Sequence, residues 1–126
     1  MNSVSAVSET FSRDDRLRKR REFEECYASG VRVSGRHIQV FLLSGGPGTR
    51  PRLGISVPRR VGKAVARNRV RRRLREIFRR HRSLVPESAL SLVINVRPTA
   101  AAATFAELLE DYRTTIGRAL SRLPRQ

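Results

Sequence analysis

The chain has 126 residues, enough for one domain with a modest hydrophobic core. Lys and Arg outnumber Asp and Glu by 27 to 11, so the net charge of +16 favours a nucleic-acid partner over a membrane. No apolar stretch is long enough to cross a bilayer, and residues 1–12 lack the apolar core of a secretory signal. The single cysteine, Cys26, excludes an internal disulfide and fits a reducing compartment, so we expect a cytoplasmic protein.

The first predicted element is a helix over residues 15–29, which Gly30 ends at its C-terminal side. On a helical projection one stripe combines cations, aromatic residues and the cysteine: Arg16, Lys19, Arg20, Phe23, Cys26 and Tyr27. Phe23 and Tyr27 are then either ordinary core anchors or stacking surfaces for unpaired bases whose phosphates the cations would hold. The residues alone leave both interpretations open.

Residues 31–43, 52–57 and 89–97 predict strands, because apolar residues alternate along them with small or polar ones. Residues 44–49, which include three glycines and a proline, predict a loop. A sheet covered on both faces would show nearly continuous apolar runs, so we expect one face to be at least partly open. Phe41 is the one large aromatic residue expected on that face, where it either packs under the first helix or remains accessible.

The helix predicted over residues 64–82 carries most of the charge. Its apolar stripe consists of Val70, Leu74, Ile77, Phe78 and His81. Residues 59–82 include 12 basic residues and one acid, so they hold +11 of the net charge of +16. Four arginines along one ridge repel each other unless phosphates neutralise them: Arg67, Arg71, Arg75 and Arg79. The pattern predicts a surface for a polyanion, although a solvated helix face or a general bias toward arginine would give a similar composition.

The last helix is predicted over residues 104–120, where Thr104 and Glu107 have the spacing of a capping box. Its apolar side chains are expected to cover the apolar face of the sheet: Phe105, Leu108, Leu109, Tyr112, Ile116 and Leu120.

We expect no catalytic and no metal-binding residue in the chain. Its acidic residues are scattered, and Cys26 has no metal-ligating partner at a workable spacing. His37 and His81 are far apart in the sequence, and His81 falls on an apolar stripe, where a core histidine is expected.

The order of residues in the basic segment resembles the signature of the bacterial ribonuclease P protein subunit. The match is Gly62-Lys63-Ala64-Val65-Ala66-Arg67-Asn68-Arg69-Val70-Arg71-Arg72, followed by Leu74-Arg75-Glu76 and Phe78. The resemblance covers residues 16–120 and implies an α+β fold, a two-layer αβββαβα sandwich like the second domain of ribosomal protein S5. It also implies a left-handed βαβ crossover. We expect one domain over residues 13–122, a disordered tail over residues 1–12 and a short C-terminal tail over residues 123–126.

The resemblance further implies that an RNA subunit carries the active site and its magnesium ions. The protein would bind ribonuclease P RNA and precursor tRNA, whose 5′ leader the ribonucleoprotein removes, and would need no membrane and no protein partner. The RNA subunit would contact Arg59, Arg60, Lys63, Arg67, Asn68, Arg69, Arg71, Arg72 and Arg75. The leader would lie along Arg16, Lys19, Arg20, Phe23, Tyr27 and Phe41. The aromatic residues match positions that border the leader cleft of the family, with Tyr27 in place of a more usual phenylalanine. A structural RNA-binding protein of ribosomal type, with no role in cleavage, fits the composition equally well and is the alternative.

Overall fold

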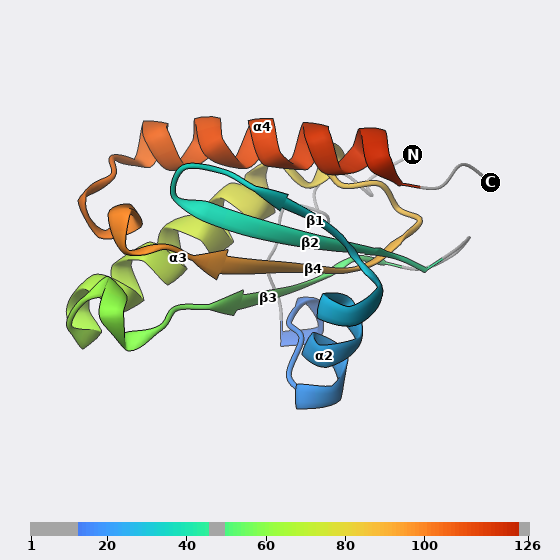
Figure 1. Ribbon diagram of the computed structural model, residues 1–126, viewed down its shortest axis with the longest axis horizontal. Helices are drawn as coiled ribbons and strands as arrows, with labels where there is room; N and C mark the ends of the chain where they lie inside the picture. The colour runs from blue at the N-terminus through green and yellow to red at the C-terminus, as the bar shows by residue number, and fades with distance from the viewer. Residues whose placement is uncertain (1–12, 46–49, 124–126) are drawn as a thin grey trace.

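In the computed structural model, which describes residues 13–45 and 50–123, a mixed sheet separates one helix from two others (Figure 1). The elements are α2 (Arg20–Ser29), β1 (Val31–Ser34), β2 (Ile38–Ser44), β3 (Arg52–Ser56), α3 (Ala64–Arg80), β4 (Ala89–Val96) and α4 (Phe105–Arg122). The predicted αβββαβα order is confirmed. The predicted tails lie outside the described residues except for Leu123, and so do residues 46–49 of the predicted loop.

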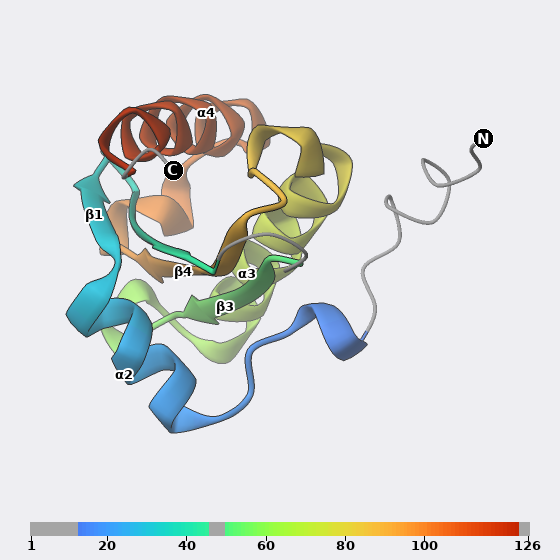
Figure 2. The ribbon, with the colours of Figure 1, turned by 90° about the vertical axis from the view of Figure 1, so that its right-hand side faces the viewer.

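The strands have the order β1-β2-β4-β3. β2 pairs antiparallel with β1 and with β4, whereas β3 pairs parallel with β4. Parallel neighbours need a crossover connection, and α3 provides it on the face of the sheet that α4 also covers (Figures 1 and 2). The crossover is left-handed, as the resemblance implies, although most such connections are right-handed.

The main hydrophobic core lies between the sheet and the layer formed by α3 and α4. The inward-facing residues of β2 and the apolar stripe of α3 are all 0% exposed: Ile38, Val40, Leu42, Val70, Leu74, Ile77 and Phe78. Each such side chain contributes about 1.5–3 kcal/mol on burial, which offsets the repulsion among the arginines of α3. The predicted core face of α3 is confirmed over these positions.

Three core assignments at helix ends are wrong. α3 ends at Arg80, and His81 caps it in a partly exposed, non-helical conformation. In α4, Phe105 and Leu120 are 38% and 36% exposed, since the ends of a helix have fewer neighbours than its middle. The capping box that begins α4 is confirmed, because Glu107 N donates to Thr104 Oγ1 at 3.1 Å and Thr104 N donates to Glu107 Oε1 at 2.8 Å.

The first helix begins later than its pattern predicts. Arg13–Asp15 forms a 3₁₀ turn, and the chain then runs extended beside β3 until α2 begins at Arg20. Two tertiary contacts hold this path: Leu17 is buried, and the Asp15 carboxylate, 1% exposed, forms a salt bridge of 2.9 Å with Arg82. These contacts outweigh the local helical pattern, so Arg16 lies outside α2.

Candidate nucleic-acid interface

The turn before α3 brings cations to the surface. In the 3₁₀ turn Arg59–Val61 the last side chain is buried in the core, whereas the two arginines are exposed. Gly62 follows with a φ of 152°, a backbone conformation that residues with a side chain rarely adopt. Lys63, which is also exposed, is then the N-cap of α3. The turn therefore places three cations at the N-terminal end of the helix.

The predicted contacts for the RNA subunit lie on this turn and on α3 as far as Arg75, and none forms a salt bridge with a described carboxylate. Two of them are oriented by neutral acceptors. Arg67 Nε donates to Gly62 O at 3.2 Å, and Arg71 Nη1 donates to Asn68 Oδ1 at 2.9 Å. These hydrogen bonds fix the guanidinium groups without neutralising them, so their charge remains available to a ligand.

The C-terminal half of α3 is different, because it contains an acid. Glu76 forms a salt bridge of 2.6 Å with Arg79 and a second one with Arg80. The hydrogen bond from Arg79 does most to hold the pKa of Glu76 below its ordinary value. The predicted ridge of unpaired arginines is therefore wrong at Arg79, and it ends at Arg75.

The predicted aromatic contacts for the leader differ in their accessibility. Tyr27 is 38% exposed, whereas Phe41 is 7% exposed and packs with Cys26 and Val93 under α2. The Tyr27 and Phe41 rings meet edge to face, with centroids 4.7 Å apart. Phe23 is half-buried against the same cluster. Phe41 thus packs under the first helix, which was one of its two predicted arrangements. Of the three aromatic residues, Tyr27 has the most surface left for a base.

The predicted cations for the leader lie at the start of α2 and before it. Lys19 is the N-cap of α2, and Arg20 forms an exposed pair of 3.2 Å with Glu24, which contributes little to stability. Arg16 instead lines a small pocket of about 80 Å³ together with Phe23 and Arg75. The structure therefore brings together residues that the sequence analysis assigned to two sites.

Arg75 is the residue at which the two predicted surfaces meet. Burial lowers its pKa, and the nearby positive charges of Arg16 and Arg71 lower it further. Like charges that converge in this way favour an anionic ligand between them.

The partly open face of the sheet was predicted, but the groove of about 660 Å³ that lies on it, where α2 leaves it uncovered, was not. Its polar lining includes Arg36, Gln39, Ser56, Arg60, Asn95 and Arg97. Gln39 and Ser56 are both register partners of Asn95, so the three side chains form a row across β2, β4 and β3. Tyr27 O–H donates to Asn95 Oδ1 at 2.8 Å, which joins the groove to α2. The polar positions of the alternating strands were the available signal, because they mark the face opposite the main core.

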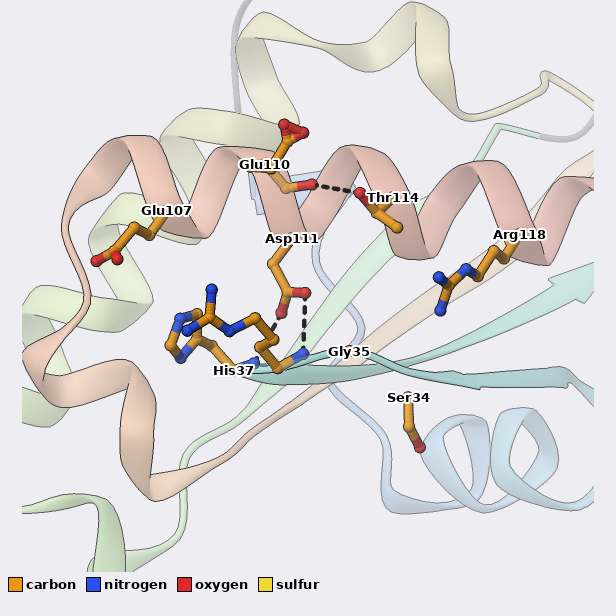
Figure 3. A pocket seen from close by; sticks show the side chains of 9 residues that line it. Ser34, Gly35, His37, Glu107, Glu110, Asp111, Thr114 and Arg118 are labelled. Carbon is orange, nitrogen blue, oxygen red and sulfur yellow. Dashed lines mark hydrogen bonds between the residues drawn. The ribbon is translucent and has the colours of Figure 1, made fainter.

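A second hollow, of about 450 Å³, lies between the β1–β2 turn and α4 (Figure 3). Asp111 of α4 is 8% exposed and accepts the backbone N–H groups of Arg36, His37 and Ile38 at 3.0, 2.8 and 3.1 Å. Gly35 is needed beside it, because a Cβ there would overlap the Asp111 carboxylate. Asp111 thus ties the turn to α4, and we assign this hollow to the fold.

Within residues 13–45 and 50–123, no group of three His, Cys, Asp or Glu side chains is placed to hold a metal ion. His37 is buried, with Nδ1 at 2.9 Å from Thr99 Oγ1, whereas His81 lies at the end of α3. None of the described helices is both long enough and apolar enough to span a membrane.

A family model described as Ribonuclease P matches residues 11–120 of the chain. The chain is 40% identical over 111 residues to the ribonuclease P protein component of Desulfovibrio desulfuricans, covering 86% of this chain and 85% of the relative. It is 42% identical over 106 residues to that of Acidothermus cellulolyticus, covering 82% and 86%. The structure of the Staphylococcus aureus RNase P protein at 2.0 Å matches with a TM-score of 0.75 and 28% identity, over 83% of this chain and 94% of that one. The RNase P protein from Thermotoga maritima matches with a TM-score of 0.72 and 30% identity, over 82% and 96%.

Proposed function

The chain belongs to the family of ribonuclease P protein components, and on that basis we propose that it holds two RNAs at once. In this proposal the RNA subunit of ribonuclease P binds to the turn before α3 and to the N-terminal half of α3. The 5′ leader of precursor tRNA binds beside α2 and along the polar groove of the sheet. Family membership favours this function over that of a structural RNA-binding protein of ribosomal type.

The observation that carries the proposal is the distribution of unpaired cations. From Arg59 to Arg75 the surface holds guanidinium groups without a described carboxylate partner, while Arg79 and Arg80 are paired. Planar guanidinium groups suit phosphate oxygens, and each neutralised phosphate also releases counterions. A folded RNA with closely spaced phosphates is the ligand that this surface fits best.

The leader surface has a different chemistry. It combines an accessible aromatic ring, Tyr27, with the polar row of Gln39, Ser56 and Asn95 and with arginines at the rim. Unpaired bases stack on aromatic side chains, and arginines hold the phosphates between them. A single strand fits this surface better than a duplex does.

The protein contributes binding and orientation to the proposed reaction, and cleavage takes place on the RNA subunit. Magnesium ions held by that RNA would activate the attacking water and stabilise the leaving oxygen. By fixing the leader, the protein orients the precursor for cleavage and discriminates it from mature tRNA, which has no leader. We place this assembly in the cytoplasm.

The test separates the two surfaces with variants that leave the core intact. Arg69 and Arg72 are exposed and make no described salt bridge, so Arg69→Ala/Arg72→Ala removes charge without breaking a structural contact. Each charge-assisted contact contributes about 1.5–3 kcal/mol, so binding to the RNA subunit should weaken by about 100-fold or more. Arg113→Ala/Arg118→Ala removes the same charge from the exposed side of α4 and should have a much smaller effect.

Tyr27→Ala should have the opposite pattern. Loss of a base stack costs about 1–3 kcal/mol, so the assembled enzyme should bind leader-bearing tRNA more weakly and leaderless tRNA unchanged. The measurements are titrations of each variant with the RNA subunit, and of each holoenzyme with both tRNAs. A folded Tyr27→Ala protein that loses the RNA subunit but keeps its preference for a leader would contradict the assignment.

A further inference from the structure

We propose that Asn95 and Gln39 recognise the edge of one unpaired base of the leader, and that the Tyr27 hydroxyl positions Asn95 for this contact. The inference rests on the proposed leader-binding function. It adds a determinant of base identity to a surface whose arginines would bind any sequence equally well.

The two amides lie opposite each other on neighbouring strands. Gln39 and Asn95 are register partners on β2 and β4, and both line the groove on the face of the sheet opposite the main core. Directly opposed residues of an antiparallel pair have Cβ atoms about 4.5–5.5 Å apart, so the two side chains can contact one planar ligand. Arg36, Arg60 and Arg97 line the same groove, where they can hold the phosphates on either side of a base.

The Tyr27 hydroxyl orients the Asn95 side chain. Tyr27 O–H donates to Asn95 Oδ1 at 2.8 Å, and within the described ranges the Asn95 side chain makes no other hydrogen bond. Its Nδ2 therefore keeps two N–H donors for a ligand. Burial raises the pKa of Tyr27 above its ordinary value, so the phenol remains a donor at neutral pH.

Gln39 is held through its amide nitrogen, whereas Asn95 is held through its amide oxygen. Gln39 Nε2 donates to Ser34 Oγ at 3.0 Å, which leaves Gln39 Oε1 as an acceptor for the groove. The pair therefore offers the donor group of Asn95, Nδ2, beside the acceptor of Gln39, Oε1. A phosphate carries no proton at neutral pH for Gln39 Oε1 to accept, whereas the edge of a nucleobase has donors and acceptors side by side. A ribose 2′-hydroxyl also donates and accepts, but from a single atom, whereas a base edge has its donor and acceptor on separate atoms and can bond to both amides at once.

The experiment is an abasic scan of the leader, measured as the dissociation constant of the holoenzyme for each substrate. With the unsubstituted protein, removing one particular base should weaken binding about three- to tenfold, as an ordinary hydrogen bond does. In Asn95→Ala the penalty at that position should fall below about twofold, while the penalties at the other positions stay the same. Tyr27→Phe, which keeps the ring and removes the hydroxyl, should reduce the same penalty.

Asn95→Asp is the second variant, in case Asn95→Ala is poorly folded. Its carboxylate still accepts from Tyr27 O–H but has no N–H donor, so the base-specific penalty should disappear as in Asn95→Ala. Added negative charge weakens all leader substrates alike and leaves the differences between them unchanged. Ser34→Ala, which frees the Gln39 amide to rotate, should reduce the penalty partly.

Three results would overturn the inference or part of it. If the penalties of the Asn95 variants match those of the unsubstituted protein at every position, Asn95 recognises no base. If the Asn95 variants lose the penalty but Tyr27→Phe retains it, the base contact stands and the positioning role of Tyr27 is refuted. If the unsubstituted holoenzyme binds leader-bearing and leaderless tRNA equally, the proposed function fails, which is a distinct outcome.

Discussion

Replacing Gly54 with alanine should loosen α2 from the sheet. A Cβ at this position of β3 would lie 2.6 Å from Cε2 and Cζ of Phe23 and 3.1 Å from Cδ1 of Leu17. Ordinary contacts between carbon atoms are about 3.5–4.0 Å, so the Phe23 ring has to move by about 1 Å. Overpacking of this kind costs about 1–3 kcal/mol of stability. Because Phe23 and Tyr27 belong to the same short helix, leader binding should weaken as well.

Urea denaturation measures the effect, and Gly117→Ala is the matched control. Gly117 lies on the exposed side of α4, where an added Cβ has no atom within 4 Å. The control should therefore stabilise the protein by about 0.5–1 kcal/mol, since alanine is the better helix former. If Gly54→Ala is as stable as the unsubstituted protein, the Phe23 ring does not lie against Gly54 of β3, and the described packing of α2 on the sheet is wrong.

Three further predictions test other parts of the molecule. Asp111→Ala leaves three backbone donors without their acceptor and should cost at least about 3 kcal/mol in urea denaturation, whereas the exposed Glu110→Ala should be nearly neutral. Burial raises the pKa of Cys26 from 9.0 to about 11, so at pH 8 a thiol reagent should label the native protein about 100-fold more slowly than the unfolded one, and equal rates would contradict the burial. Because the pKa of Cys26 is higher in the folded protein, the unfolded protein releases this proton first as the pH rises. The stability that the protonated, buried thiol contributes is therefore fully present below pH 9 and is lost as the pH rises toward 11. Binding to the RNA subunit should have a slope of log K against log salt on the order of −4 or steeper, and a slope near −1 would mean that most arginines of α3 face solvent.

The fold could be predicted to a large extent because its signals are local. The apolar stripe of α3 and the alternation in β2 each report one buried face, and the capping box reports where α4 begins. The start of α2 could not be predicted in this way. It depends on the salt bridge between Asp15 and Arg82, whose partners are 67 positions apart in the sequence.

The site could be predicted only in part, for a related reason. Sequence periodicity showed that Phe41 and Gln39 share a face of the sheet, but it could not show how far α2 extends across that face. α2 covers Phe41 and leaves Gln39 and Asn95 in an open groove. Of the two alternatives for Phe41, packing under the first helix is therefore the one observed, and polar residues without an assigned role line the groove.

The placement of the few acids decides which arginines remain available to RNA. Glu76 pairs with two arginines at the end of α3, Glu22 pairs with Arg52 beside α2, and the buried Asp15 pairs with two arginines from elsewhere in the chain. These pairs brace helix ends and hold the N-terminal segment against β3, so their arginines have structural roles. By contrast, no described salt bridge includes a cation of the surface from Arg59 to Arg75 or any of the three arginines of the groove. A count of arginines does not distinguish the two groups, but the position of their carboxylate partners does. For Asp15 and Glu22 the paired arginines are distant in the sequence, so the fold is needed to identify them.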